Sequence, residues 1–321
     1  MLISANDIQA AAERLHPYLA PTPTIRSEYY SHKTGANIFF KLEIFQPTHS
    51  FKVRGALNAL LCLPEMQRQK GVITASQGNH GMGVVFAAKQ LGVSAAVYLG
   101  KNAAPARVEQ LKAMGAEVVL YGDSWDEANQ RAMEVAKAEG KAFVHPFDDA
   151  NVMAGQTTIF VELMQQIPKV NVVIASIGGG GLISGIISAA QYFSPSTQVI
   201  GVETVGADSM YQSRQAGKIV ELPAITSIAT SLGARRTEQA QFEIVTKYAA
   251  DVVAVPDAMA IQSMLELLNE DKLLVEPAAS CILAAITNGQ IQVKVDSNVV
   301  VVLCGANVTL ENVRAWSKIL S

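Results

Sequence analysis

The chain has 321 residues, half of them hydrophobic and 17% charged, with a formal net charge of -3. This composition provides a large buried core, and it contains no block of like charge and no basic stripe interleaved with aromatics, so nucleic acid and membrane surfaces are excluded as expected partners. The three scattered cysteines form no disulfide framework or Cys-x-x-Cys pair, so we expect a reducing, cytoplasmic location. No apolar stretch approaches the roughly 20 residues that span a bilayer.

The first 14 residues predict a capped amphipathic helix, and short β-branched runs then alternate with helical patterns. The predicted strands are Asn37–Leu42, Gly71–Thr74, Ala95–Leu99, Glu117–Leu120, Ala142–Val144, Asn171–Ser176, Gln198–Glu203, Val252–Val255 and Asn298–Leu303. The predicted helices include Asn79–Leu91, Ala104–Met114, Ser124–Ala138, Ala154–Gln166, Leu182–Tyr192, Ala258–Leu268 and Glu276–Ile286. This alternation predicts an α/β fold with parallel sheets that share one compact body, since no Pro/Gly/Ser linker divides the chain.

Lys52 stands in the segment Gln46–Ala56, between Phe51 and Val53, at a turn that enters a helix. Most lysines are solvated surface residues. At a partly desolvated position, however, an amine loses its proton more readily and can form a Schiff base.

The segment Ser76–Gly81 follows a predicted strand and opens a helix. Ser76 and Asn79 are suitable helix caps, and capping alone explains their presence. The free N–H groups at such a helix start can equally bind a substrate carboxylate. His80 is interpreted as a helix residue, not as a catalytic base.

Four consecutive glycines, Gly178–Gly181, lie between a predicted strand and a helix. They let the backbone turn its N–H groups around an anion, and a phosphate there also meets the positive end of the helix dipole. A tight turn without a ligand is one alternative. A dinucleotide loop is another, with Glu203 as the ribose-binding acid, although Ile183 or Ser184 occupies the last position of the Gly-x-Gly-x-x-Gly pattern.

Cys304 ends a continuous apolar run and precedes a glycine. Such a cysteine is usually an inert buried thiol. The carboxyl end of a parallel strand is also where residues face a ligand, so a binding role stays open.

Together these segments resemble the fold-type II pyridoxal-phosphate enzymes, and within them the serine/threonine dehydratases and serine racemases. The motifs that carry the resemblance are Ser50–Ala56, Ser76–Gly81, Gly178–Gly181, Glu276–Ala279 and Cys304–Asn307. The resemblance implies two open twisted parallel-sheet domains of the tryptophan synthase beta-like architecture, with the cofactor between them. It places the large domain at residues 1–64 and 149–321 and the small domain at residues 65–148.

The resemblance also implies roles for the motif residues. Lys52 would hold pyridoxal 5'-phosphate as a Schiff base and act as the catalytic residue, Cys304 would face the ring nitrogen, and Asn79 would bond the ring hydroxyl. The other implied cofactor-binding residues are Phe51, Gly178, Gly179, Gly180, Gly181 and Leu182, and the implied substrate-binding residues are Ser76, Gln77, Gly78, Asn79 and His80.

The implied activity is β-elimination from L-serine, L-threonine or a related β-hydroxy amino acid, giving a 2-oxo acid and ammonia. A thiol is a poor proton donor to the ring nitrogen, which suits elimination because no long-lived carbanion is needed. Serine racemases place a serine at the position of Gln77, so racemisation is the less favoured alternative. A cysteine synthase-like β-replacement enzyme and a non-catalytic amino-acid sensor on the same fold are the others.

A cation site and an assembly follow from the same resemblance. Glu203, Ser209 and the carbonyl near Ala207 would hold a cation, and because Ser209 adds no charge, potassium is favoured over magnesium or manganese. An acid that only caps a helix or forms an ion pair is the alternative for Glu203. Dimers are common in the family, so a homodimer is expected. The chain ends shortly after Trp316, without the regulatory domain of the biosynthetic threonine dehydratases, which implies a catabolic role.

Overall fold

The computed structural model describes residues 1–76 and 78–320. Within these residues the strands form two sheets, a large one of order β1-β2-β10-β7-β8-β9 and a small one of order β5-β4-β3-β6. The strands are β1 (Thr24–Arg26), β2 (Asn37–Lys41), β3 (Val72–Ala75), β4 (Ala95–Leu99), β5 (Glu117–Leu120), β6 (Ala142–Phe143), β7 (Val172–Ser176), β8 (Gln198–Thr204), β9 (Asp251–Val255) and β10 (Asn298–Val302). Apart from β1, which pairs antiparallel with β2, neighbouring strands are parallel.

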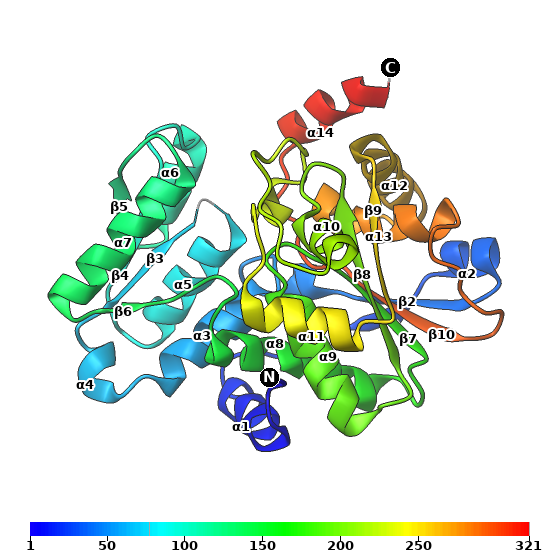
Figure 1. The fold of residues 1–321 in the computed structure, drawn as a ribbon, viewed down its shortest axis with the longest axis horizontal. Helices are drawn as coiled ribbons and strands as arrows, with labels where there is room; N and C mark the ends of the chain where they lie inside the picture. Colours follow the sequence, from blue (N-terminus) through cyan, green and yellow to red (C-terminus); the bar gives the residue numbers. More distant parts are fainter. Residues whose placement is uncertain (77, 321) are drawn as a thin grey trace.

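Helices surround both sheets (Figure 1). The α-helices are α1 (Ala5–Leu15), α2 (Glu28–Thr34), α3 (Lys52–Cys62), α4 (Glu65–Arg68), α5 (Asn79–Gln90), α6 (Pro105–Ala113), α7 (Trp125–Glu139), α8 (Ala150–Gln166), α9 (Gly181–Phe193), α10 (Ser209–Ala216), α11 (Gln239–Tyr248), α12 (Asp257–Glu270), α13 (Pro277–Thr287) and α14 (Leu310–Ser317). Short 3-10 helices are η1 (Glu43–Phe45), η2 (Thr230–Leu232) and η3 (Lys318–Leu320). None of the described helices is long and apolar enough to cross a membrane.

The predicted α/β fold with two parallel sheets is confirmed, with two local differences. Strand β1 was not expected, because three residues at a sheet edge leave no alternation to detect. Helix α8 begins at Ala150, four residues before the predicted start, because the Asp149 side chain accepts from the N–H groups of Asn151 and Val152 and caps the helix. The strands of the small sheet lie within the range predicted for the small domain, whose exact limits stay a prediction.

The small sheet is covered on both faces. Along β3, Val72 belongs to the core formed with α3, α5 and α6, whereas Ile73 and Ala75 belong to a separate core with α7. This division follows from strand geometry, since successive side chains point to opposite faces. The sheet is therefore enclosed, as its continuous apolar sequence predicts.

Helix α3 lies between the two sheets in Figure 1, with α5 on the side of the small sheet and α8 on the side of the large one. Ala56, Leu57 and Leu60 of α3 share a core with Val84 and Val85 of α5. The first residue of α3 is Lys52. The fold thus places this lysine at the junction of the two sheets.

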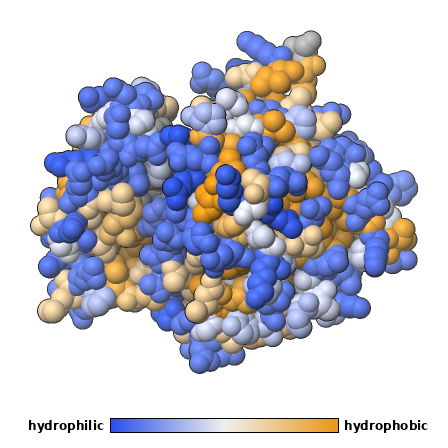
Figure 2. Space-filling view, in the orientation of Figure 1, coloured by the Kyte–Doolittle hydropathy of each residue, from blue (hydrophilic) through white to orange (hydrophobic). Residues whose placement is uncertain are grey.

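Helix α14 stands apart from this core. It projects at the top of Figure 1, and none of its residues, all within the described part of the chain, is buried. Leu310 is 70% exposed. Figure 2 shows hydrophobic residues on the projection at the top of the view, where the chain ends. The end of the chain therefore contributes little to the site at the junction.

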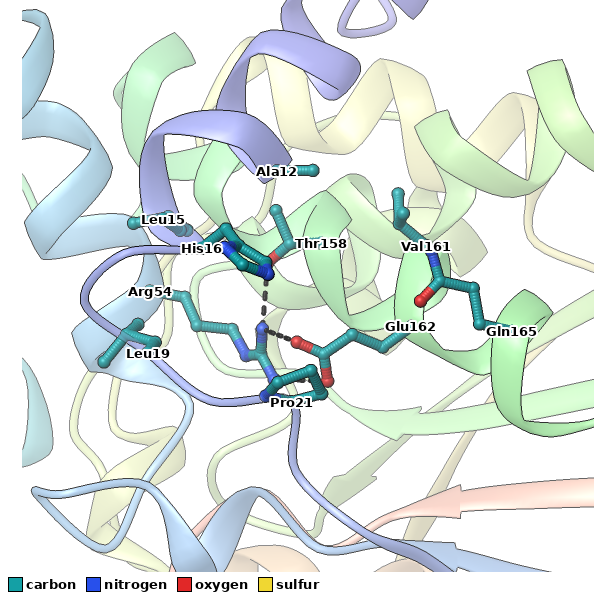
Figure 3. A pocket seen from close by; sticks show the side chains of 10 residues that line it. All are labelled: Ala12, Leu15, His16, Leu19, Pro21, Arg54, Thr158, Val161, Glu162 and Gln165. Atoms are coloured by element: carbon teal, nitrogen blue, oxygen red, sulfur yellow. Dashed lines mark hydrogen bonds and ion pairs between the residues drawn. The ribbon is translucent and has the colours of Figure 1, made fainter.

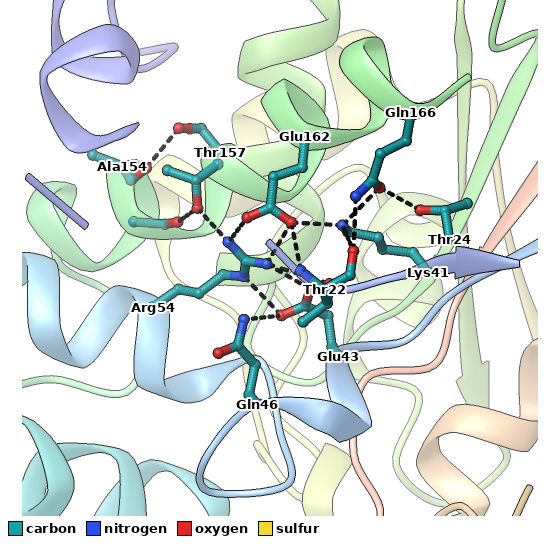
Figure 4. A network of polar contacts seen from close by, with 12 residues as sticks. Thr22, Thr24, Lys41, Glu43, Gln46, Arg54, Ala154, Thr157, Glu162 and Gln166 are labelled. Carbon is teal, nitrogen blue, oxygen red and sulfur yellow. Dashed lines mark hydrogen bonds and ion pairs between the residues drawn. The ribbon is translucent and has the colours of Figure 1, made fainter. Parts of the chain in front are cut away.

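A buried network of ion pairs connects α3 to η1, β2 and α8 (Figure 4). Arg54 donates to both carboxylate oxygens of Glu43, at 2.7 and 2.8 Å, and to both of Glu162, at 2.6 and 2.8 Å. Lys41 donates to Glu162 at 2.5 Å and to the carbonyl of Thr22 at 2.7 Å. Two cations and two anions thus balance within the core, which is what allows charges to be buried.

A cavity of about 90 Å³ opens beside the network, between α1 and α8 (Figure 3). Its lining includes Leu15, Thr158, Val161 and the ion pair of Arg54 with Glu162. It has room for a few water molecules, and no predicted site residue lines it. The cavity is therefore not the site at the junction of the sheets.

The Glu43 carboxylate provides a test of the network. Burial alone raises the pKa of this carboxyl, but the charge and hydrogen bonds of Arg54 outweigh burial and hold the pKa below its ordinary value of 4.5. Because the pKa is lowered in the folded state, the stabilisation is present above the unfolded pKa and is lost as pH falls through the folded one.

We expect Glu43→Gln to lower the free energy of unfolding at neutral pH by about 3 to 5 kcal/mol, because it leaves Arg54 buried without its full countercharge. Urea denaturation measures this change, and the gap to the wild type should narrow as pH falls below 4.5. The control Glu109→Gln alters an exposed pair with Lys112 and should have no measurable effect. An equally small loss in Glu43→Gln would show that the network does not stabilise the fold.

Candidate active site

Two segments from opposite ends of the chain pair at the junction of the sheets. Ser50 forms an antiparallel bridge with Gly305, the N–H of Phe51 donates to the carbonyl of Cys304 at 3.1 Å, and that of Ala306 donates to His49 at 2.9 Å. Phe51 is the N-cap of α3, so the next residue, Lys52, begins the helix directly beside the end of β10. The predicted Schiff-base lysine and the predicted ring-nitrogen residue are therefore neighbours.

The Lys52 amine is partly withdrawn from solvent. Its Nζ donates to the carbonyl of Pro146 at 2.8 Å and lies 5.2 Å from the centre of the Phe51 ring. Burial lowers the pKa of Lys52 from 10.5 to about 8, and the nearby Cys304 offsets part of that shift. An amine of this kind supplies more of its neutral, nucleophilic form near neutral pH than a surface lysine.

The Cys304 thiol is buried and close enough to Lys52 to interact with its charge. Its Sγ lies 3.4 Å from the Ser176 hydroxyl oxygen and 3.8 Å from the carbonyl oxygen of Ala278. Burial raises the pKa of the thiol to about 12. Cys304 therefore stays protonated and uncharged, and it offers a ligand only a weak hydrogen-bond donor. Ser176 has no role in the sequence predictions, and a serine that ends an apolar strand gives no signal of one.

The glycine loop begins two residues after Ser176, which ends β7. Gly180 has a φ of +95°, a conformation that glycine adopts without strain, and a side chain at Gly179 would collide with the Phe147 ring, at 2.2 Å. Within the described residues, the N–H groups from Gly178 to Ile183 donate to no backbone carbonyl. They stand at the start of α9, where a phosphate meets both free donors and the helix dipole.

The asparagine loop faces the pair of segments from the side of the small sheet. The Ser76 hydroxyl accepts from the N–H of Gly78 at 3.2 Å, and Gly78 is the N-cap of α5. Gln77 lies outside the described residues. Asn79 donates through Nδ2 to Glu276, at 2.9 and 3.2 Å, and its Oδ1 accepts from Asn307 at 2.6 Å.

His80 is buried and turned away from a base role. Its Nε2 lies 3.0 Å from the Val144 carbonyl oxygen, which accepts the proton, while Nδ1 has no partner in the described part of the chain. Burial lowers the pKa of His80 to about 3. The imidazole is therefore neutral at physiological pH, in agreement with its interpretation as a helix residue.

The predicted cation residues lie at the end of β8. The Glu203 carboxylate is buried and accepts from the N–H groups of Met210, at 3.1 Å, and Tyr211, at 2.6 Å. Burial raises the pKa of Glu203 well above its ordinary value. The Ser209 hydroxyl is buried without a partner among the described residues, and Ala207 lies in the loop between these two. The same two contacts are expected if Glu203 only caps the start of α10.

These residues fit pyridoxal phosphate. A partly buried amine, a neutral thiol and a loop of free N–H groups stand on adjoining segments, linked by the contact of Cys304 with Ser176 and of Lys52 with Pro146. Such a donor set matches an aldehyde, a ring nitrogen and a phosphate. The Glu203 segment lies on the next strand along the large sheet.

The chain is similar to known proteins over most of its length. Residues 15–305 match the family model described as pyridoxal-phosphate dependent enzyme. An L-threonine ammonia-lyase of Geobacter sulfurreducens is 40% identical over 95% of this chain and 76% of its own length. A catabolic L-threonine dehydratase of Staphylococcus aureus is 37% identical over 97% of this chain and 91% of its own. The structure of maize serine racemase, 32% identical, superposes with a TM-score of 0.93 over 99% of this chain and 97% of that one.

The lowered pKa of Lys52 predicts its reactivity in the cofactor-free protein. Acetylation of this amine, followed by peptide mass spectrometry, should rise with pH and reach half of its maximum rate near pH 8. The Lys52→Arg variant, which lacks the amine, serves as the control for peptide assignment. A half-maximum near pH 10.5 would show that the amine is not desolvated.

Proposed function

The chain belongs to the pyridoxal-phosphate-dependent enzyme family, and from this premise we propose that it is an ammonia-lyase that converts L-serine, L-threonine or a related β-hydroxy amino acid to a 2-oxo acid and ammonia. The observation that carries the proposal is the Lys52 amine, with its lowered pKa, beside the protonated Cys304 thiol. Relatives at 36 to 40% identity that are named L-threonine ammonia-lyase or dehydratase support it.

Pyridoxal phosphate supplies, when bound, an electron-withdrawing system that makes the Cα–H bond of an attached amino acid acidic. Lys52 would hold it covalently, the Gly178–Gly181 loop would hold its phosphate, and Cys304 would lie against its ring nitrogen. The Lys52 Nζ would take the Cα proton of the substrate, since a pKa of about 8 leaves a useful fraction of neutral amine. The N–H groups in the first turn of α5 would hold the substrate carboxylate.

Racemisation is the second candidate, supported by the likeness to maize serine racemase. A racemase needs a second acid/base on the opposite face of the substrate. In the serine racemases that this chain resembles, a serine has that role, and this chain has Gln77 at its position. The amide of a glutamine does not act as an acid or base near neutral pH. We further propose that the enzyme is a homodimer that acts in the cytoplasm. Its role would be catabolic, with serine as well as threonine as substrates.

Lys52→Ala should abolish 2-oxo acid release from L-serine and L-threonine while the fold persists, because the group lost is both the covalent partner and the proton acceptor. A panel of β-hydroxy amino acids, assayed for 2-oxo acid, identifies the substrate. Circular dichroism provides the control for folding. A variant that keeps even about one percent of the wild-type rate would mean that another residue acts as the base.

We also propose that Glu203, Ser209 and a backbone carbonyl near Ala207 hold a monovalent cation. One carboxylate and one neutral hydroxyl provide too little charge for a hard divalent ion. Among the described residues, no three His, Cys, Asp or Glu side chains cluster to hold a metal ion. The Ser209 hydroxyl, which has no partner among the described residues, is an available oxygen ligand.

Activity should therefore rise with potassium and change little when divalent ions are chelated. Ser209→Asp should move the preference toward magnesium or manganese, because it adds the missing carboxylate. Initial rates in sodium-free buffers of varied potassium concentration measure both effects. If chelation abolishes wild-type activity and potassium does not restore it, the site is divalent.

A further inference from the structure

The Glu276 carboxylate is where both sheets meet at the site. Glu276 is the N-cap of α13, a position from which an acid usually accepts from its own helix, yet it makes no such bond. Instead, its carboxylate, only 4% exposed, accepts from Asn79, from the Ser231 hydroxyl and from the N–H of Asn307 at 2.9 Å. One buried anion thus receives three donors from three separate segments.

Each donor belongs to a different wall of the site. Asn79 opens α5 on the side of the small sheet. Ser231 precedes Leu232, whose Cα lies 3.2 Å from where a side chain on Gly178 would begin, so its segment lies against the glycine loop. Asn307 follows the Cys304–Gly305 segment that pairs with Ser50 and Phe51.

The close approach depends on Gly305. A Cβ at this position would lie 2.7 Å from a Glu276 oxygen and 3.0 Å from the Asn79 amide nitrogen. The Gly305 carbonyl also accepts from the Glu276 N–H at 3.0 Å. The backbone beside Cys304 therefore holds Glu276 directly.

The Asn79 amide is oriented by these contacts. A carboxylate only accepts, so the NH₂ group of Asn79 must face Glu276, and its oxygen then faces the Asn307 donor. An uncharged amide in place of Glu276 would bring its own NH₂ group toward one of these donors and would remove the reason for a single orientation. The charge of Glu276 also acts on the other side of the junction. Burial lowers the pKa of Arg107 on α6, and the charge of Glu276 opposes that shift.

We propose that Glu276 is a positioning residue that fixes the Asn79 amide and couples the three walls of the site, a role that rests on the proposed function for its kinetic part only. It touches no reacting atom in this assignment and acts through Asn79, Ser231 and Asn307.

Glu276→Gln in the holoenzyme tests this role. We expect kcat for L-serine to fall by about 10- to 100-fold, as for residues that orient a reacting group, with a smaller change in KM. The visible absorption band of the bound cofactor should shift, and the cofactor dissociation constant should rise. Ser231→Ala removes one donor only and should shift the same quantities less, in the same direction. The matched control, Glu13→Gln, changes an exposed glutamate on α1 and should shift none of them.

The outcomes separate the two proposals. If Glu276→Gln keeps kcat within about twofold of the wild type with an unchanged absorption band, the positioning role is wrong, whatever its effect on thermal stability. If the wild type releases no 2-oxo acid, the proposed function fails. The spectrum and the cofactor dissociation constant of Glu276→Gln then decide the positioning role by themselves, since both report the ring environment without turnover.

Discussion

The site depends on the pairing of Ser50 and Phe51 with Cys304 and Gly305. Lys52 and Cys304 lie 252 positions apart in the chain, and this short antiparallel contact brings them together. The contact is possible because β2 and β10 are parallel neighbours in the large sheet, so that the segments following them leave the same edge. The remaining groups, the glycine loop on β7 and the asparagine loop on β3, reach the junction by the same rule.

Burial then decides the charge of each group at the junction. It lowers the pKa of Lys52 to about 8 and of His80 to about 3, and it raises that of Cys304 to about 12. Each shift favours the uncharged form. The Glu276 carboxylate accepts from three donors that belong to separate segments. The site therefore combines reacting side chains that are shifted toward their uncharged forms with one carboxylate that contacts three of its walls.

The sequence was sufficient for the architecture and for the motifs, for different physical reasons. The alternation of apolar runs specifies a parallel α/β fold, and a strand followed by glycines or a capping residue marks the edge where ligands bind. The Gly178–Gly181 loop and Cys304 could be placed at that edge in this way, whereas the roles of Lys52 and Cys304 were predicted from the resemblance to the fold-type II enzymes. The contacts of Glu276, Ser231 and Ser176 could not, because ordinary polar residues acquire a role only through partners that are remote in sequence. Strand β1 escaped prediction because its pairing, not its pattern, makes it a strand.

The buried network of Arg54, Glu43, Glu162 and Lys41 affects how the stability of the protein changes on heating. The hydration of charged groups becomes less favourable as temperature rises, so the penalty for burying them falls, while hydrophobic stabilisation levels off. The ion network beside α3 therefore contributes a larger share of the stability, relative to the apolar layers, as the protein is warmed. On heating, the helix that begins with Lys52 should be among the last parts of the junction to loosen, and the exposed turns of α14 among the first.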